Sequence, residues 1–289
     1  MIDRQPIVEW IKNYVHQSGR KKVVVGISGG IDSALTACLA VEALGKENVI
    51  GVMMPFGTLP KTDKRANLPI QLAANLDIQY GVFSIDDAVL SLSDTFHTME
   101  AEPHNASNLL PIQERRLMLG NAQARVRMTA LYMYAETHKA LVIGTTNKTE
   151  MIIGYYTKYG DGGVDFEPIS GLYKTQVYEV AKQYPEIPVG IIGASSSAEL
   201  WEGQTDEDEL GITYANLDLF LKEGVHNLSF SINDKHPVKV SDIQFEPRKE
   251  KVLDYISIEQ AKRILDLIKS TDHKRKQPPC FGTDNGISL

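Results

Sequence analysis

The sequence predicts an α/β protein with an open, mostly parallel, twisted sheet and helices on both faces. Four short apolar runs indicate the strands, because they lack the polar alternation of a strand that faces water on one side. They lie at residues 22–27, 48–53, 140–143 and, more weakly, 78–84. Helical patterns separate them, and such alternation is typical of a parallel sheet with right-handed crossovers. We therefore expect ligands beyond the carboxyl ends of the strands.

Helical patterns account for much of the remaining chain. The apolar residues from Ile7 to Tyr14 recur at the spacing of one helix face, and Pro6 suits an N-terminal helical position. Further helices are expected at residues 33–44, about 63–76, about 112–139, 174–184, 212–222 and 257–270. Residues 224–255 hold strand-like fragments without a clear period. We expect one α/β domain over residues 1–289, with extra helices in its N- and C-terminal parts.

Composition and charge argue against several classes of protein. Thirty Lys and Arg against 37 Asp and Glu leave a net charge of −7, which disfavours binding to nucleic acid. Hydrophobic residues make up 43% and charged residues 23%, as in ordinary globular proteins. Cys38 and Cys280 are too few for a disulfide framework or a zinc site. No signal peptide or membrane-spanning run is visible, so we expect a cytoplasmic protein that binds no membrane.

A glycine-rich turn follows the first predicted strand and opens the next helix. It reads Gly26-Ile27-Ser28-Gly29-Gly30-Ile31-Asp32-Ser33. Small residues let the backbone approach an anion closely, and a helix start supplies free N–H groups, so the turn suits phosphate. Asp32 would repel phosphate unless a cation lay between them, which makes it a natural Mg²⁺ ligand. The simpler alternative is a glycine turn with Ser or Asp as the helix N-cap.

A second glycine-rich stretch, rich in aromatic and charged residues, follows the predicted strand at 140–143. It is about thirty residues long without a period, and loops of that length are usually functional. Glu150 in this stretch could join Asp32 in holding Mg²⁺. Lys158 and Lys174 suit phosphates or carboxylates, although either lysine alone could be a solvated surface residue.

Other conspicuous residues have simpler interpretations. Residues 206–209 are expected to form a solvated helix start rather than a metal site. The basic run 273–276 could bind nucleic acid, but such a run after a helix more often complements the helix dipole. Arg125 and Arg127 point to different helix faces, so at most one meets a given ligand. Cys38 occupies an apolar helical position and is expected in the core.

The SGGxDS pattern of the first turn resembles the signature of the ATP pyrophosphatases, which split ATP between the α and β phosphates. Five further blocks make the sequence very similar to the ammonia-dependent NAD synthetase family. They are GNAQARVRM (120–128), GTTNKTE (144–150), GYYTKYGDGGVD (154–165), the stretch 195–211 and HKRKQPP (273–279). The resemblance covers most of the chain outside about 56–110 and 224–256. It implies a Rossmann-like sheet of the adenine nucleotide alpha hydrolase type.

This resemblance also implies roles for individual residues. The ATP phosphates would lie against residues 26–33, and Mg²⁺ would bind Asp32 and Glu150. The ATP site would be completed by Thr145, Lys174 and Ser197, although Ser196 stands where the family usually has proline. Deamido-NAD would be held by Arg125, Lys158, Asp165, His273 and Lys274. Family members are homodimers with this dinucleotide at the subunit interface, which the helix over 112–139 would build.

The implied reaction is ATP-driven amidation of deamido-NAD to NAD, the final step of NAD biosynthesis. The nicotinate carboxylate would attack the α-phosphorus of ATP, giving an acyl-adenylate and pyrophosphate, and ammonia would then displace AMP. Asp32 and Lys174 would be catalytic, and Asp161 would orient or deprotonate ammonium. The chain leaves no room for a glutaminase domain, so the nitrogen source would be free ammonia or ammonia from a separate chain.

Two other functions remain open on the sequence. A tRNA-modifying adenylating ligase would use the same phosphate loop, but the acidic net charge and the two distant cysteines argue against it. A non-catalytic nucleotide sensor could share the fold, but the retention of Asp32, Glu150 and Lys174 argues against lost chemistry.

Overall fold

The computed structural model describes residues 1–57, 67–100, 111–197, 205–223, 225–226, 244–245 and 256–276. Its centre is a four-stranded sheet in the order β3-β2-β1-β4, with all neighbours parallel. The strands are β1 (Lys22–Gly26), β2 (Val49–Met53), β3 (Gln79–Val82) and β4 (Ala140–Ile143). This confirms the predicted parallel sheet. The chain order reverses between β1 and β4, so their carboxyl ends form the switch point where ligands of such sheets bind.

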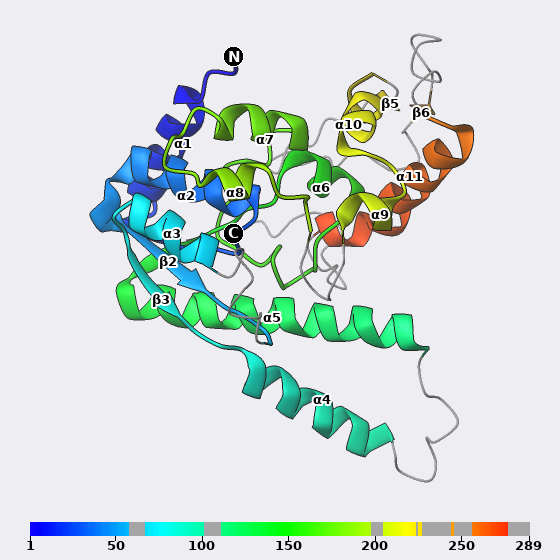
Figure 1. Cartoon of the computed structure of the whole chain (residues 1–289), viewed down its shortest axis with the longest axis horizontal. Helices are drawn as coiled ribbons and strands as arrows, with labels where there is room; N and C mark the ends of the chain where they lie inside the picture. Colours follow the sequence, from blue (N-terminus) through cyan, green and yellow to red (C-terminus); the bar gives the residue numbers. More distant parts are fainter. Residues whose placement is uncertain are drawn as a thin grey trace, which may run out of the picture.

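The central strands are apolar because both faces of the sheet are covered (Figure 1). Val23, Val24 and Val25 of β1 are fully buried, and alternate residues of the strand belong to different apolar clusters. A parallel bridge from Ile143 to Phe166 extends the pairing beyond the end of β4. That bridge brings residues 165–167 beside the switch point.

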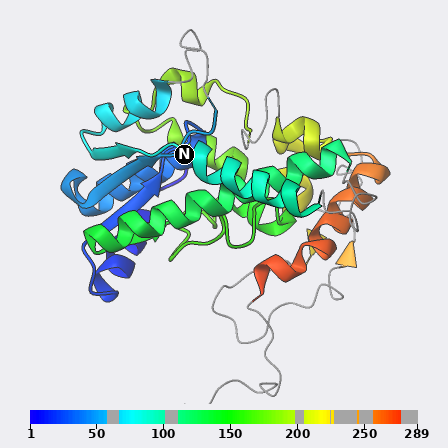
Figure 2. The same cartoon turned by 90° about the horizontal axis from the view of Figure 1, so that it is seen from below.

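Helices on one face pack around α2 (Ile31–Leu44). They are α1 (Gln5–Gln17), α3 (Leu68–Asn75), α7 (Lys174–Ala181) and α8 (Val189–Ile192). The opposite face is covered by the long α5 (Ile112–His138), and α4 (Asp86–Glu100) packs against α5 (Figures 1 and 2). Both layers were expected, but α4 was not, and α3 begins only at Leu68. Residues 58–66, where part of the predicted 63–76 helix falls, lie outside the described chain.

A smaller group of helices forms a second apolar cluster beside the sheet (Figure 1). It comprises α6 (Lys148–Ile153), α9 (Asp206–Leu210), α10 (Tyr214–Glu223) and α11 (Ile258–Ser270). Short 3₁₀ turns occur at Lys46–Asn48 (η1) and Asp272–Arg275 (η5), and β5 (Val225–His226) pairs antiparallel with β6 (Gln244–Phe245). The predicted extra helices of the C-terminal part are thus confirmed. Among the described residues, no helix has the length and apolarity to cross a membrane.

Candidate active site

The glycine-rich turn lies at the carboxyl end of β1 and is shaped by its own serines. Gly29 has φ +95°, a backbone conformation that side chains disfavour, and Gly30 is the N-cap of α2. Ser28 Oγ accepts from the Gly30 N–H over 3.1 Å and lies 3.1 Å from Ser33 Oγ. No described side chain caps the helix, so the Ser or Asp N-cap alternative is not observed. The first-turn N–H groups of α2 are therefore well suited to an anion.

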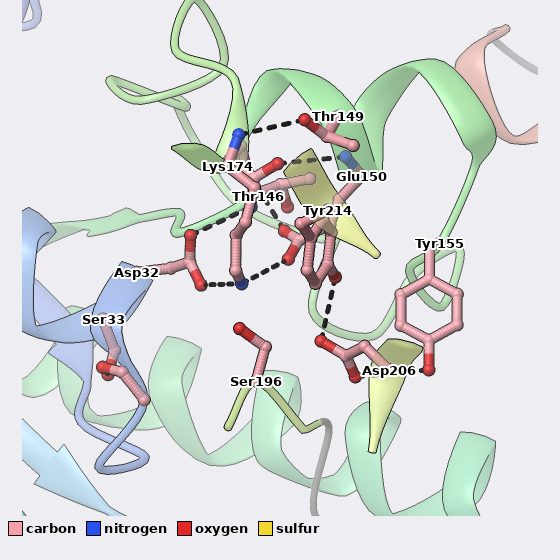
Figure 3. A network of polar contacts seen from close by, with 12 residues as sticks. Asp32, Ser33, Thr146, Thr149, Glu150, Tyr155, Lys174, Ser196, Asp206 and Tyr214 are labelled. Atoms are coloured by element: carbon pink, nitrogen blue, oxygen red, sulfur yellow. Dashed lines mark hydrogen bonds and ion pairs between the residues drawn. The ribbon is translucent and has the colours of Figure 1, made fainter. Parts of the chain in front are cut away.

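Three residues from separate helices meet beside this turn (Figure 3). Lys174, the first residue of α7, places its Nζ 2.5 Å from Asp32 Oδ2 and 3.2 Å from Glu150 Oε1. Asp32 lies in the first turn of α2 and Glu150 in that of α6. The structure thus brings together the three residues that the sequence selected for ATP and Mg²⁺.

Asn147 holds the two carboxylates in place and was missed in the sequence analysis. Its Nδ2 donates to Asp32 Oδ1 over 2.9 Å, and its Oδ1 accepts from the Glu150 N–H over 3.0 Å. Glu150 Oε2 accepts in return from the Asn147 N–H over 3.2 Å, which completes a capping box at the start of α6. The signal was present, because Asn followed three residues later by Glu is typical of a helix N-terminus.

Burial sets the electrostatics of this cluster. It raises the pKa of Glu150 to about 8, a shift that Lys174 opposes and Asp32 increases. Burial also disfavours charge on Lys174, but Asp32 and Glu150 outweigh it and hold the pKa of that ammonium above its usual range. Two carboxylates therefore share one cation.

The same two carboxylates fit a divalent cation. They are hard oxygen donors that already converge on one ammonium, and Mg²⁺ is usually held by one or two carboxylates plus substrate phosphates. No cluster of three or more His, Cys, Asp or Glu suited to a metal occurs in the described part of the chain. Two carboxylates of the protein would leave the other coordination positions of Mg²⁺ to phosphate oxygens and water.

Asp206 corrects one prediction. Residues 206–209 do begin a helix, but Asp206 is buried with 3% exposure instead of being solvated. Its carboxylate accepts from Tyr214 Oη over 2.9 Å and from Tyr155 Oη over 3.3 Å (Figure 3). Burial of a carboxylate requires such donors, and these come from α10 and from the segment after α6, which the local sequence does not reveal.

Asp218 is a buried residue that the sequence analysis missed. It lies on α10 with 1% exposure and accepts from Thr149 Oγ1 over 2.5 Å. Its other oxygen accepts from the backbone N–H and the hydroxyl of Thr175, at 2.8 and 2.7 Å. Thr149 Oγ1 accepts in turn from the Lys174 N–H over 3.0 Å. Asp218 thus ties together the N-terminal turns that carry Glu150 and Lys174.

Glu167 was also missed, and no sequence motif pointed to it. Its Oε2 accepts from the Thr146 N–H over 2.9 Å, one residue before Asn147. Its carboxyl group occupies the space where a side chain at Gly144 would lie. Oε1 is buried without a hydrogen-bond partner among the described residues, and burial raises the pKa of Glu167 to about 8.

Four of the five residues predicted to hold deamido-NAD lie together. Lys158 Nζ donates to the His273 carbonyl over 2.5 Å, and Arg125 Nη2 donates to the Lys158 carbonyl over 3.4 Å. Lys274 Nζ donates to the carbonyls of Gly154 and Tyr156, at 2.7 and 2.6 Å. The η5 turn is thereby fixed to the glycine-rich stretch after α6.

Two further basic residues, Arg275 and Arg127, are placed as the sequence predicts. Arg275 donates to the carbonyls of Ile152 and Ile268, near the C-termini of α6 and α11, as the dipole interpretation predicts. Arg127 Nε donates to the Met54 carbonyl, on a different side of α5 from Arg125.

The other predicted site residues have these positions. Asp165, the fifth deamido-NAD candidate, accepts from the Val142 N–H over 2.7 Å and from Tyr132 Oη over 3.3 Å. Its carboxylate thus satisfies a backbone N–H group of the edge strand β4. Asp161 Oδ1 accepts from the Thr157 N–H over 2.9 Å and closes a turn. Thr145 is half-buried just beyond β4, and Ser197 precedes residues 198–204, which are outside the described chain. Their ligand-binding roles stay predictions.

Cys38 is buried, as predicted. Its exposure is 2%, and burial raises the pKa of its thiol to about 12. A thiol in this state is an inert core residue.

A parallel α/β sheet with a glycine-rich anion turn, a buried lysine and two converging carboxylates at its switch point defines a nucleotide-binding enzyme. The family model of NAD synthase matches residues 4–278. The chain belongs to the NAD synthase family, whose members are ligases. This confirms the family membership predicted from the motifs.

Individual proteins show the same similarity over nearly the whole chain. The NH(3)-dependent NAD(+) synthetase of Methanosarcina acetivorans is 42% identical over 275 residues, which is 94% of each chain. The structure of NMN synthetase from Francisella tularensis matches with a TM-score of 0.74 at 31% identity and covers 96% of this chain and 95% of that one. The NH3-dependent NAD synthetase of Campylobacter jejuni matches with a TM-score of 0.67 at 30% identity and covers 96% and 99%.

Proposed function

We propose that this protein catalyses the ammonia-dependent, ATP-driven amidation of deamido-NAD to NAD, with release of AMP and pyrophosphate. The observation that carries the proposal is the meeting of Asp32, Glu150 and Lys174 beside the anion turn that opens α2. Membership of the NAD synthase family supports the assignment of the acceptor. We further propose that residues 1–289 act as one domain and that the reaction takes place in the cytoplasm.

The first step brings an anionic nucleophile to an anionic phosphate. A carboxylate oxygen of the nicotinate group attacks the α-phosphorus, the bond from that phosphorus to the β-phosphate bridging oxygen breaks, and pyrophosphate leaves. No proton is transferred, so the work of the protein is positioning and charge neutralisation. The first-turn N–H groups of α2 and the ammonium of Lys174 would supply both.

Asp32 and Glu150 would hold Mg²⁺ in this proposal. When bound, the metal would neutralise phosphate charge and help to orient the leaving pyrophosphate. Lys174 lies between the same two carboxylates, so loading with a metal and ATP would release its ammonium toward the phosphates. Asn147 would keep both carboxylates oriented during the exchange.

The second step forms the amide. Ammonia attacks the acyl carbon, the bond from that carbon to the AMP oxygen breaks, and the nitrogen loses one proton. We keep Asp161 as the group that orients ammonium or accepts this proton. The turn that carries Asp161 is packed against α5, since a side chain at Gly160 would meet Ala124 and Thr157 at 2.9 Å. A fixed turn of this kind suits a positioning role.

The dinucleotide acceptor can be tested directly. The protein is incubated with ATP, Mg²⁺, ammonium and deamido-NAD, and NAD and AMP are quantified by chromatography. Equal amounts of NAD and AMP are expected. Formation of ADP, or tight ATP binding without turnover of the dinucleotide, would reject the proposal in favour of another nucleotide enzyme or a sensor.

Nicotinate mononucleotide should be tested as a second acceptor in the same assay, because the F. tularensis protein with a similar structure is an NMN synthetase. Nicotinate mononucleotide presents the same carboxylate without the adenylate half of deamido-NAD. We expect a much lower kcat/KM for the mononucleotide, because binding energy from the missing half would be lost. A kcat/KM for the mononucleotide that equals or exceeds that for deamido-NAD would assign this chain to NMN synthesis.

We also propose a homodimer built on the face formed by β3, α4 and α5. Large apolar side chains of this face are exposed, including Leu92 at 57%, Leu117 at 51% and Met133 at 61%. Large apolar side chains that are exposed to water are common at interaction sites. Light scattering coupled to size-exclusion chromatography should give twice the 32.1 kDa chain mass, and Leu92→Glu with Met133→Glu should shift it toward the monomer.

A further inference from the structure

We propose that Tyr214, held in place by Asp206, is a positioning residue that keeps the Lys174 ammonium directed into the active site. This inference rests on the proposed function, because it concerns the lysine assigned there to the ATP phosphates. It gives a role to Asp206, a residue of the acidic stretch 206–209 that the sequence predicts to be a solvated helix start.

The first observation is the contact between the tyrosine ring and the lysine. The Lys174 Nζ lies 5.0 Å from the centroid of the Tyr214 ring, and Figure 3 shows the ring beside the ammonium. Lys174 is 2% exposed and Tyr214 is 5% exposed. An ammonium so close to an aromatic ring, with both groups removed from water, is attracted by the negative charge density of the ring face.

The second observation is that the ring is anchored at both ends. The Tyr214 N–H donates to Glu207 Oε1 over 2.7 Å, and its hydroxyl donates to Asp206 Oδ2 over 2.9 Å. Asp206 is fixed in turn, since its N–H donates to the Ser196 carbonyl over 3.0 Å and its Oδ1 accepts from Tyr155 Oη. A ring held in this way has one orientation and presents the same surface to Lys174.

The chemistry of the partners explains why a ring is useful here. Asp32 and Glu150, the two carboxylates that hold Lys174, are also the ones proposed to bind a metal. If Asp32 and Glu150 bind the metal, Lys174 loses both of its ion-pair partners. An aromatic ring does not compete for Mg²⁺, which prefers oxygen ligands. Tyr214 can therefore hold the ammonium in the site before and after the exchange.

A purely structural role for Tyr214 must be separated from this one, because the residue also belongs to the apolar cluster of α6, α9, α10 and α11. Two variants separate the role of the ring from that of the hydroxyl. Tyr214→Phe keeps the ring and removes the hydroxyl, and Tyr214→Leu removes both. Tyr184→Leu is the matched control. Tyr184 is buried to a similar degree, donates to the carboxylate of Glu42 and lies under Arg4, but it belongs to a different part of the fold.

The readouts are thermal stability, ATP affinity by calorimetry without deamido-NAD, and kcat and KM for ATP. We expect Tyr214→Leu to weaken ATP binding and to lower kcat/KM for ATP by about 10- to 30-fold. Tyr214→Phe keeps the ring but loses its bond to Asp206, so it should show a smaller loss of both than Tyr214→Leu. Tyr184→Leu should lose stability only. A folded Tyr214→Leu variant with wild-type ATP affinity and kcat/KM would overturn the proposal, as would a loss of the same size in Tyr184→Leu.

The calorimetric arm also separates this proposal from the proposed function. If the wild type bound ATP but made no NAD, the proposed function would fail, while weaker ATP binding by Tyr214→Leu would still support positioning. If the wild type made NAD and Tyr214→Leu matched it, positioning alone would fail.

The role of Asp206 is tested by a double-mutant cycle with Tyr214→Phe and Asp206→Ala. If Asp206 acts through the tyrosine hydroxyl, the double variant should lose no more ATP affinity than Asp206→Ala alone. Additive losses would show that Asp206 does not act through Tyr214 and would reject that part of the proposal.

Discussion

Asn147 Nδ2 donates a hydrogen bond to Asp32 Oδ1 over 2.9 Å, and this bond joins the N-terminal turns of α6 and α2. The two turns follow β4 and β1, which are neighbours in the sheet. Two helix N-termini therefore meet at the switch point, each with a carboxylate in its first turn. The helix dipoles and the Lys174 ammonium stabilise these charges, and the same positive groups are available to phosphate.

The first prediction concerns Asp32. Asp32→Asn keeps the size of the side chain but removes one of the two charges that balance Lys174 and would hold the metal. We expect kcat/KM to fall by about 10²- to 10³-fold, the range found when one electrostatic group of an active site is removed. Circular dichroism should show a retained fold. The exposed Asp87→Asn on α4 is the control, and near-normal activity of Asp32→Asn would refute the metal assignment.

The second prediction concerns the pH dependence of stability and Glu167. Burial raises the pKa of this carboxyl to about 8 from its ordinary value of 4.5. Between these two pH values the folded protein keeps a proton that the unfolded chain releases. The unfolding free energy therefore falls as pH rises through this window. Glu167→Gln removes this contribution, and the variant should gain stability relative to wild type between pH 5 and pH 8.5, by about 3 kcal/mol.

Urea unfolding at several pH values measures this difference. Glu136→Gln, at an exposed position on α5, serves as the control and should follow the wild-type curve. If the Glu167→Gln and wild-type curves ran parallel from pH 5 to pH 8.5, the carboxyl of Glu167 would be charged throughout and the prediction would be wrong.

The third prediction concerns Asp218. Asp218→Asn replaces an acceptor of three hydrogen bonds, from Thr149 and Thr175, by an amide that presents N–H to at least one donor. Buried donors without acceptors are costly, so the unfolding free energy should fall by about 2–4 kcal/mol. Activity at a temperature where the variant is folded should fall as well, because Thr149 holds the Lys174 backbone. Asp266→Asn, on the exposed side of α11, should be neutral in both measurements.

The strands and most longer helices could be predicted from sequence because their signal is local. Residues 23–25 and 140–143 are apolar without alternation, as burial on both faces requires. Helix α4 was missed, and two of its apolar residues, Leu90 and Leu92, are exposed. The short α6 was missed because one and a half turns carry no detectable period.

In the site, too, the residues in local motifs could be predicted, and the residues that depend on distant partners could not. Asp32, Glu150 and Lys174 could be selected because each stands in a motif after a strand or at a helix start. The burial of Asp206 and the role of Asp218 could not, because their partners Tyr214 and Thr175 come from other elements. A carboxylate in an acidic helix start is ordinarily solvated, and only the tertiary donors reverse that expectation.

The last prediction concerns Gly144, just beyond β4. A Cβ atom there would lie 2.3 Å from the Glu167 carboxyl carbon, so Gly144→Ala must displace that carboxyl and break its bond with the Thr146 N–H. The displaced group ends a flexible side chain, so the expected cost is that of the hydrogen bond, about 1–3 kcal/mol, rather than that of a backbone clash. Chemical denaturation of Gly144→Ala and Glu167→Ala, singly and together, measures the coupling. In the Glu167→Ala background the glycine substitution should cost almost nothing, whereas Gly171→Ala, with no atom within 4 Å, should be neutral in both backgrounds. An equal cost of Gly144→Ala in both backgrounds would mean that the glycine is needed by the backbone and not by Glu167.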